Sequence, residues 1–316
     1  MKRYLVTGGG GFIGSKIASR LVERGDQVIV TDNLSTGAEE NVPQGVEFIG
    51  LDISQAEHFN RIPTGHYDGV LHLAAQSSGE ISHDNPGYDL STNALGTLLL
   101  LDWCSKNDIS RFMYASSMAV YGTTEESPVN EDQRLDPISF YGITKQAAEH
   151  YVRYYSEHGL DTTVFRMFNV YGPGQNLENM KQGMVSIYLA FLLREEPVLV
   201  KGSMDRYRDF IYIDDVVSAW VTALDDPVSY GKTYNLASGK KTLVKELLSG
   251  VIEAFGHNPE TYPVEQGDGT PGDQFGIYAN ISRLTDELDW KPEVPVPEGL
   301  KRMADWAKEI STGNNK

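Results

Sequence analysis

Short apolar runs alternate with longer amphipathic stretches through the first half of the chain. The apolar runs predict strands, and most of the stretches between them have the period of helices. The predicted strands cover residues 3–7, 27–31, 46–49, 69–73, 111–115 and 162–166. Strands that alternate with helices form parallel sheets, because each return to the sheet needs a crossover. The pattern therefore predicts an α/β fold: a Rossmann doubly wound parallel sheet with helices on both faces.

The rhythm changes after the Pro/Gly-rich segment 169–176. Beyond it the pattern predicts helices near 184–194 and over 214–225, 242–255 and 297–310, with irregular stretches between them. We therefore expect a first domain over residues 1–168 and a smaller C-terminal α/β domain over residues 169–316. Segments near 207–238 are expected to pack back on the first domain.

Composition and charge restrict the partners of this 316-residue chain. Its formal net charge of −17 disfavours nucleic acid and acidic membrane surfaces. No run approaches the roughly 20 apolar residues of a membrane span, and the first strand begins without signal-peptide architecture, so we expect a cytoplasmic protein. The single Cys104 excludes an internal disulfide, and the seven histidines lack paired ligand spacing, so no metal is expected.

A glycine-rich turn follows the first predicted strand. Glycines at 8, 11 and 14 permit a tight turn, close approach of the backbone to a pyrophosphate, and close packing of helix on strand. The start of the next helix would then face the phosphates. Such a run by itself could be a flexible loop. With its context below, it predicts dinucleotide contacts at Gly8, Gly11, Phe12, Ile13 and Gly14.

That context is Asp32, which ends the second predicted strand 18 residues beyond Gly14. A carboxylate there would bind the adenosine ribose hydroxyls and would repel a 2′-phosphate. The segment 33–37, beginning with the further predicted contact Asn33, contains no arginine to accept such a phosphate. We therefore predict NAD rather than NADP, and assign the first domain to NAD binding.

Two further segments at strand ends complete the predicted cofactor site. Asp52 and Ile53 follow the third strand, where they would lie near the adenine. Asp52 could equally cap the segment that follows, and both roles are compatible. Leu73, Ala74 and Ala75 close the fourth strand with mostly small side chains suited to lying against a bound cofactor.

Candidate acid/base chemistry follows the fifth strand. Ser117 lies where that strand ends, at the edge of the sheet where ligands bind in this architecture. Tyr141 and Lys145 are four residues apart, so on a helix they share one face. A free tyrosine has a pKa of about 10 and needs a nearby cation to act as a base near neutral pH. The pair alone is more often a solvated helix face.

With these motifs together, the chain resembles an extended short-chain dehydrogenase/reductase of the NAD-dependent nucleotide-sugar epimerase/dehydratase family, of the UDP-glucose 4-epimerase type. The resemblance covers nearly the whole chain in the family's order. The matching segments are Gly8-x-x-Gly11-x-x-Gly14, Asp32-Asn33, Asp52-Ile53, His72-Leu73-Ala74-Ala75, Ser116-Ser117 before Val120-Tyr121-Gly122, Tyr141-x-x-x-Lys145, Arg166 to Pro173, and Arg208 to Val216.

The resemblance implies a role for each matching residue. Ser117 and Tyr141 would handle the proton of a sugar hydroxyl, while Lys145 would bind the nicotinamide ribose and lower the pKa of the tyrosine. Asn169 would contact the substrate diphosphate, and Arg208 would clamp it. Arg208 could instead form an ion pair with Asp209 or Asp205. Arg166 and Asp214 are interpreted as structural.

The residues after Ser117 bear on the type of reaction. By the resemblance, sugar 4,6-dehydratases of this family carry an Asp-Glu pair there. This chain has Met118 and Ala119 instead, and neither side chain can transfer a proton. We therefore predict C4 epimerisation of a UDP-hexose or UDP-N-acetylhexosamine through a transient 4-keto intermediate, with Tyr141 as base. The alternative is another NDP-sugar enzyme of the family: an epimerase at another carbon, a reductase or an atypical dehydratase.

Three positions depart from the family pattern. Thr270 replaces an arginine that helps to hold the diphosphate, and Lys201 replaces an aromatic residue near the base. Ile277 stands where some relatives have a bulky aromatic residue in the sugar pocket, so it could admit an N-acetyl group. These departures leave the sugar and the nucleotide open, although a UDP-sugar is favoured.

The resemblance also implies a homodimer, built from helices near 90–105 and 141–158. Apolar residues on both segments fit a subunit interface, but they fit burial against the chain's own sheet equally well. They include Leu98, Leu101, Trp103, Tyr151 and Tyr155.

Overall fold

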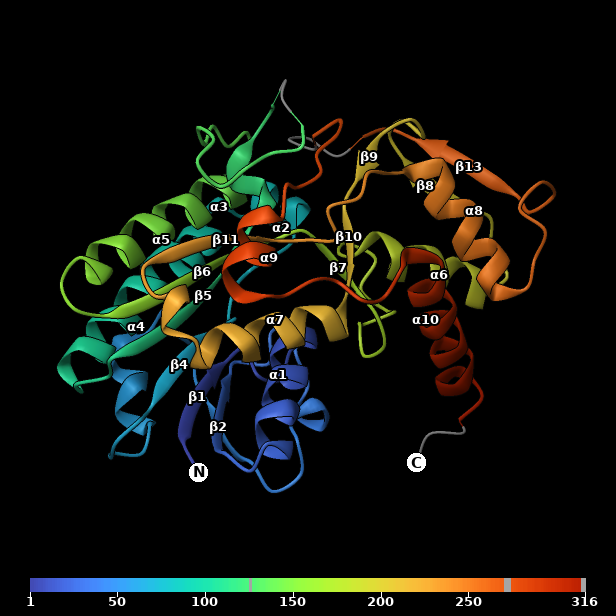
Figure 1. The fold of residues 1–316 in the computed structure, drawn as a ribbon. Helices are drawn as coiled ribbons and strands as arrows, with labels where there is room; N and C mark the ends of the chain where they lie inside the picture. Colours follow the sequence, from blue (N-terminus) through green and yellow to red (C-terminus); the bar gives the residue numbers. More distant parts are fainter. Residues whose placement is uncertain (125–126, 270–273, 314–316) are drawn as a thin grey trace.

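The computed structural model describes residues 1–124, 127–269 and 274–313. Its centre is a seven-stranded sheet in the order β11-β6-β5-β4-β1-β2-β3, in which every neighbouring pair is parallel (Figure 1). The strands are β1 (Arg3–Thr7), β2 (Gln27–Asp32), β3 (Glu47–Gly50), β4 (Gly69–His72), β5 (Arg111–Ser117), β6 (Asp161–Met167) and β11 (Lys232–Leu236). The six strands predicted from the pattern are confirmed to within two residues at each end.

Successive side chains along a strand point alternately into two separate hydrophobic cores, one on each face of the sheet. Along β1, Tyr4 and Val6 point into one core and Leu5 into the other. Helices α1 (Phe12–Glu23) and α7 (Ile213–Asp225) cover the first face. Helices α4 (Gly96–Lys106) and α5 (Phe140–Ser156) cover the second, where Cys104 is fully buried. The predicted doubly wound fold is confirmed.

The second half of the chain forms a smaller lobe beside the sheet, around a core of its own (Figure 1). Its helices are α6 (Met184–Leu193), α8 (Val244–Phe255) and α10 (Val296–Ser311). Short strand pairs join them: β7 (Asn169–Tyr171) with β10 (Phe210–Tyr212), β8 (Val198–Lys201) with β13 (Val264–Gly267), and β9 (Tyr207–Arg208) with β12 (Thr242–Leu243). The remaining α-helices are α2 (Gly79–Asp84), α3 (Pro86–Asp89) and α9 (Ser282–Leu288).

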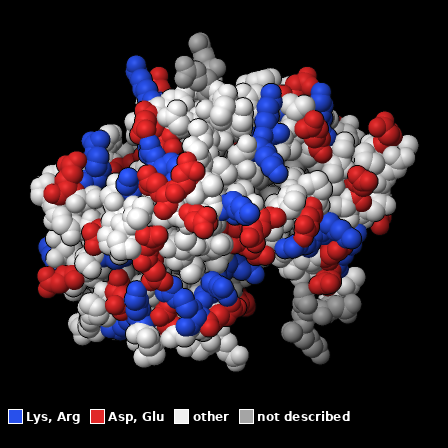
Figure 2. Space-filling view, in the orientation of Figure 1, with Lys and Arg blue, Asp and Glu red and all other residues white. Residues whose placement is uncertain are grey.

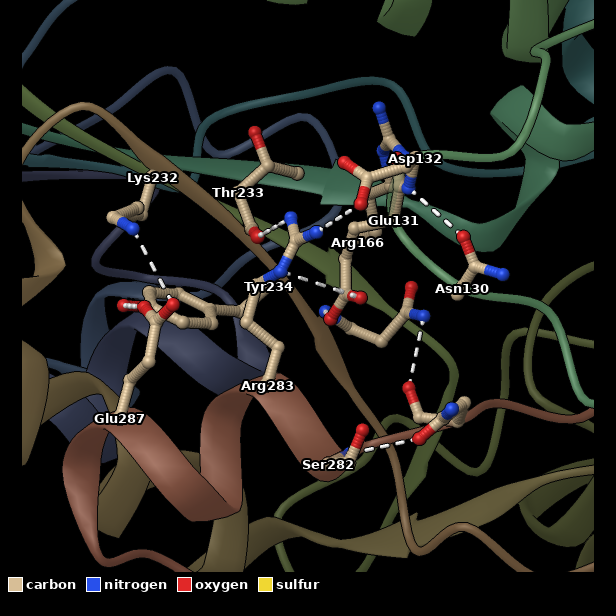
Figure 3. Close-up of polar contacts among 12 residues, drawn as sticks. Asn130, Glu131, Asp132, Arg166, Lys232, Thr233, Tyr234, Ser282, Arg283 and Glu287 are labelled. Carbon is tan, nitrogen blue, oxygen red and sulfur yellow. Dashed lines mark hydrogen bonds and ion pairs between the residues drawn. The ribbon is translucent and has the colours of Figure 1, made fainter.

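Two segments of the second half return to the first: α7 packs on α1, and β11 forms the edge of the sheet. A polar cluster fastens this edge, as Figure 3 shows. Arg283 of α9 donates to the Thr233 carbonyl oxygen and pairs with Asp132, while Glu131 accepts a hydrogen bond from the Asn235 backbone at 2.8 Å. Bonds of this kind cover an edge strand that would otherwise be open to pairing.

The surface charge is mixed, and two kinds of feature are absent from the described residues. On the face drawn in Figure 2, acidic and basic side chains are interspersed rather than gathered into one patch. Within the described residues, no helix is long and apolar enough to cross a membrane. The same residues contain no cluster of histidine, cysteine or carboxylate side chains suited to a metal ion.

Candidate active site

A cavity of about 910 Å³ lies over the C-terminal ends of the parallel strands and extends to the second lobe. This volume is at the upper end of the range for small-molecule sites. Most of the predicted site residues line it. They are Gly8, Gly11, Phe12, Ile13, Gly14, Asp32, Asn33, Ile53, Leu73, Ala74, Ala75, Ser117, Tyr141, Lys145, Asn169, Lys201 and Arg208.

The glycine turn is packed too tightly for side chains. Gly8 has a φ of +71°, and a Cβ atom there would lie 2.5 Å from the Ala74 backbone nitrogen. A Cβ on Gly14 would lie 2.2 Å from the Gly8 carbonyl oxygen. Helix α1 then begins after Gly11 without a side-chain cap. Its first N–H groups therefore suit an anionic group such as a pyrophosphate.

Asp32 lies beside this turn at the end of β2. Its carboxylate accepts hydrogen bonds from the backbone nitrogens of Gly10, at 3.0 Å, and Leu34, at 2.8 Å. Burial raises the pKa of Asp32, and these backbone donors oppose the rise. The acid therefore fixes the loop around the cavity as well as lining it.

Asp52 forms a local turn and does not cap the helical segment that follows, η2 (Ala56–Arg61), whose N-cap residue is Gln55. Its carboxylate accepts hydrogen bonds from both the backbone nitrogen and the hydroxyl of Ser54, at 2.9 and 2.7 Å. Burial acts against ionisation, but the bonds from Ser54 lower the pKa of Asp52 overall. It is not among the described residues that line the cavity, whereas the adjacent Ile53 is. The predicted cap is therefore wrong, and the contact with the adenine stays a prediction.

Helix α5 carries the tyrosine and the lysine. It begins after Ser139, whose hydroxyl accepts a hydrogen bond from the Gly142 nitrogen at 3.1 Å, the arrangement of an N-cap. Tyr141 thus lies in the first turn and Lys145 one turn later. The Lys145 ammonium donates to the Ala115 carbonyl oxygen at 2.9 Å and lies 5.9 Å from the centre of the Tyr141 ring.

Burial dominates the electrostatics of this pair. Burial raises the pKa of Tyr141 to about 12, while a hydrogen bond with Ser117 opposes the rise. Burial also lowers the pKa of Lys145 to about 8. In this arrangement the Lys145 ammonium is directed to a backbone carbonyl, and burial is the main influence on the pKa of Tyr141. That Lys145 lowers the pKa of the tyrosine stays a prediction.

A buried ion pair lies behind the serines. Arg166 contacts Glu149 at 2.8 Å and donates to the Tyr121 hydroxyl at 3.1 Å. The Ser116 hydroxyl donates to the same Glu149. Arg166 is thus held by structural partners, as predicted. Ser117, whose hydroxyl accepts a hydrogen bond from the Ala119 nitrogen at 3.2 Å, is the serine that acts to lower the pKa of Tyr141.

The second lobe contributes polar groups to the opposite wall. The Asn169 amide donates to the Asp209 carbonyl oxygen at 2.8 Å. The Arg208 guanidinium is almost fully buried and donates to the Phe275 carbonyl oxygen at 3.1 Å. The Asp209 carboxylate accepts hydrogen bonds from Ser238, Gly239 and Ala279, and Asp205 pairs with Lys245. Both acids considered as alternative partners for Arg208 thus have partners of other kinds.

Lys201 lies at the mouth of the cavity and has a partner that the sequence did not reveal. Its ammonium lies 3.0 Å from the Glu80 carboxylate, which also pairs with Lys181 at 3.3 Å. Hydrogen bonds from Lys201, and then from Lys181, lower the pKa of Glu80. All three side chains line the cavity. This cluster joins the two lobes across its opening.

The prediction for Ile277 is not supported. Its side chain is fully buried in a small core with Val120, Tyr121 and Phe168, and it is not among the described residues that line the cavity. The family resemblance placed Ile277 in the correct loop, but it did not give the direction of the Ile277 side chain. Thr270, the other predicted departure, lies outside the described residues.

Comparison with known proteins identifies the family to which this chain is similar. The profile of the NAD dependent epimerase/dehydratase family matches residues 4–237. A putative UDP-glucose 4-epimerase of Methanocaldococcus jannaschii is 35% identical over 306 residues, which is 96% of this chain and 98% of that protein.

Two solved structures have the same fold over almost the whole chain. The UDP-glucose 4-epimerase of Thermotoga maritima with UDP-glucose has a TM-score of 0.92 at 35% identity, and the alignment covers 98% of this chain and 99% of that one. The UDP-N-acetylglucosamine 4-epimerase of Methanobrevibacter ruminantium M1, in complex with UDP-N-acetylmuramic acid, has a TM-score of 0.90 at 30% identity with the same coverage.

Proposed function

This chain belongs to the NAD dependent epimerase/dehydratase family and is an NAD-dependent nucleotide-sugar epimerase, and we propose that it interconverts the C4 epimers of a UDP-hexose or UDP-N-acetylhexosamine. One observation carries the proposal. Ser117, Tyr141 and Lys145 line the cavity together, and the neighbouring Met118 and Ala119 that also line it have no group that can transfer a proton. One acid/base device suits oxidation and reduction at a single carbon better than elimination across two.

The first domain fits NAD. The open N-terminus of α1 and the close approach of Gly8 and Gly14 suit a pyrophosphate, and the Asp32 carboxylate suits an unphosphorylated ribose. Lys145 would hold the nicotinamide ribose. The bound dinucleotide supplies the reversible oxidation of one sugar carbon.

The protein's own contribution is to hold and move one proton. Only as the phenolate can Tyr141 take the proton of the sugar 4-hydroxyl as the 4-keto sugar forms, and the same proton returns to the sugar oxygen after the sugar has turned over. The Ser117 hydroxyl, bonded to the tyrosine, stabilises the phenolate during the transfer.

The nucleotide end of the substrate would meet the second lobe. Four basic side chains line the cavity there, and the carboxylate beside them is Glu80. The four are Lys181, Lys201, Arg206 and Arg208. A local excess of cations in a chain with a net charge of −17 supports a diphosphate ligand at this wall. The complexes of the two related structures support a UDP-sugar in particular.

The proposal is tested with a panel of nucleotide sugars. UDP-glucose, UDP-galactose and their N-acetyl analogues are incubated with the enzyme, with GDP-, CDP- and dTDP-sugars beside them, and products are identified by proton NMR of the sugar ring. We expect inversion at C4 of at least one UDP-sugar with no net consumption of NAD. Stoichiometric use of added NAD(P)H would instead identify a reductase, loss of water a dehydratase, and inversion elsewhere another epimerase.

We also propose a homodimer, built on helix α5 and the adjoining π-helical turn η3 (Leu90–Leu95). Leu101 and Trp103 are used within the chain, because Leu101 is fully buried and Trp103 stacks on Phe59. The large apolar residues exposed on η3 and at the start of α5 are available for contact with a second subunit. They are Leu90, Leu95, Phe140 and Ile143, between 43% and 56% exposed.

A double substitution, Leu95→Asp with Ile143→Asp, should convert the dimer to a monomer, because two pairs of charges would be buried at the interface. Sedimentation velocity measures the change. Val228→Asp, at another exposed apolar residue on a different element, serves as the control and should leave the sedimentation coefficient unchanged. A wild-type protein that sediments as a monomer at micromolar concentration would rule the dimer out.

A further inference from the structure

Asp89, the last residue of α3, is a fully buried carboxylate with no role in the reaction described above. It accepts hydrogen bonds from the Gln76 amide at 2.7 Å, the Asn93 amide at 3.1 Å and the Thr144 hydroxyl at 2.6 Å. All three donors are uncharged, and among the described residues Asp89 takes part in no ion pair. A buried charge of this kind is costly unless it has a counter-charge nearby.

These bonds join Asp89 to both sides of the active site. Thr144 lies in α5 between Tyr141 and Lys145, and its hydroxyl is also 3.1 Å from the Tyr141 carbonyl oxygen. Asn93 holds both the backbone nitrogen and the backbone oxygen of Gln76, which follows the cavity-lining Ala74 and Ala75 directly. One carboxylate therefore ties the catalytic helix to the loop along the cofactor site.

The charges around Lys145 identify the counter-charge. Asp89 and Glu149 are the carboxylates that act on its ammonium. Glu149 is already paired with Arg166. On the sheet side, burial lowers the pKa of His72 to about 3, so it is neutral.

The remaining ionisable group on that side is also uncharged. Burial raises the pKa of Tyr114, whose ring lies 5.0 Å from the Lys145 ammonium. That leaves the negative charge of Asp89 without a cationic partner of its own other than Lys145.

We propose that Asp89 is a positioning residue for the catalytic pair: its buried negative charge holds Lys145 in the cationic form, and its bond to Thr144 fixes the turn of α5 that carries Tyr141. The proposal deepens the proposed function and rests on it. Geometry carries it, since the carboxylate is bonded to the residue between the two catalytic side chains. The electrostatics agree, because Asp89 raises the pKa of Lys145 against burial and raises that of Tyr141.

The test is Asp89→Asn, which keeps the shape of the side chain and removes its charge. The new amide can donate to Thr144, whose hydroxyl can then donate to the Tyr141 carbonyl oxygen, so no buried polar group loses its partner. Without the charge, both pKa values fall. The midpoint for Lys145 should drop by about one pH unit, and both limbs of the kcat profile should move to lower pH.

The midpoint is measured by NMR of protein labelled at the lysine ε-carbon, with the Lys145 resonance assigned by its absence in Lys145→Arg. Asp305→Asn, on the exposed face of α10, controls for total charge and should leave the midpoint unchanged. Thr144→Val keeps the Asp89 charge and should shift the midpoint less than Asp89→Asn does. A Lys145 midpoint that is unchanged in Asp89→Asn would overturn the proposal. Because NMR needs no turnover, this result stands even if the sugar panel shows another reaction.

Discussion

Tyr141→Phe should lower kcat by about a thousand-fold, within the range that a positioned general acid/base contributes. The substitution removes a single hydroxyl, the group that is bonded to Ser117 and that takes the proton of the sugar. The phenyl ring fills the same space in the wall of the cavity, so the fold and NAD binding should be retained. Stopped assays on the substrate found in the panel measure kcat, and the absorbance of the purified protein measures its NAD content.

Tyr154→Phe is a matched control on the same helix. Tyr154 lies about three and a half helical turns beyond Tyr141. It is exposed and stacks on His158, so removal of its hydroxyl should leave kcat unchanged. If Tyr141→Phe turned over at the wild-type rate with NAD bound, Tyr141 would not be the base. Ser117→Ala should then be compared, since its hydroxyl is the other proton carrier at this point of the cavity.

Local signals predicted most of the fold and the cofactor side of the site. The glycine turn, Asp32 and the Tyr141/Lys145 spacing each act within one turn or one strand end, where the chain itself fixes the geometry. The turn at Asp52 is also local, since its carboxylate accepts hydrogen bonds from Ser54 two residues later. In such cases a sequence contains nearly all of the necessary information.

Contacts across long sequence distances were beyond prediction. Asp89 meets Thr144 55 residues later, and Glu80 meets Lys201 121 residues later. No periodicity marks either pair, because only the packed fold brings them together.

Side-chain direction and burial were the other limits. Ile277 occupies the expected loop but points into the core with Val120 and Phe168. The pKa of Tyr141 depends mainly on desolvation, which the spacing to Lys145 does not reveal. A matched position in the sequence is therefore not always a matched environment in the fold.

Gly14→Ala should weaken NAD binding by about 100-fold, because overpacking costs up to about 3 kcal/mol. The new Cβ atom would lie 2.2 Å from the Gly8 carbonyl oxygen, and no side-chain rotation can move either atom. Gly8 itself lies close against the Ala74 backbone, where even an added Cβ atom would be 2.5 Å from the Ala74 nitrogen. Helix α1 must therefore move away from the turn, and its N-terminal N–H groups lose their position for the pyrophosphate.

Isothermal titration of cofactor-free protein with NAD measures this effect, with circular dichroism to verify the fold. Gly50→Ala is the control, because the added methyl group at the end of β3 would meet open space and should leave the affinity unchanged. The two variants add the same atoms, so a difference between them isolates the close approach at the turn from any general effect of replacing glycine. Wild-type affinity in a folded Gly14→Ala protein would mean that the dinucleotide is bound without the help of this helix terminus.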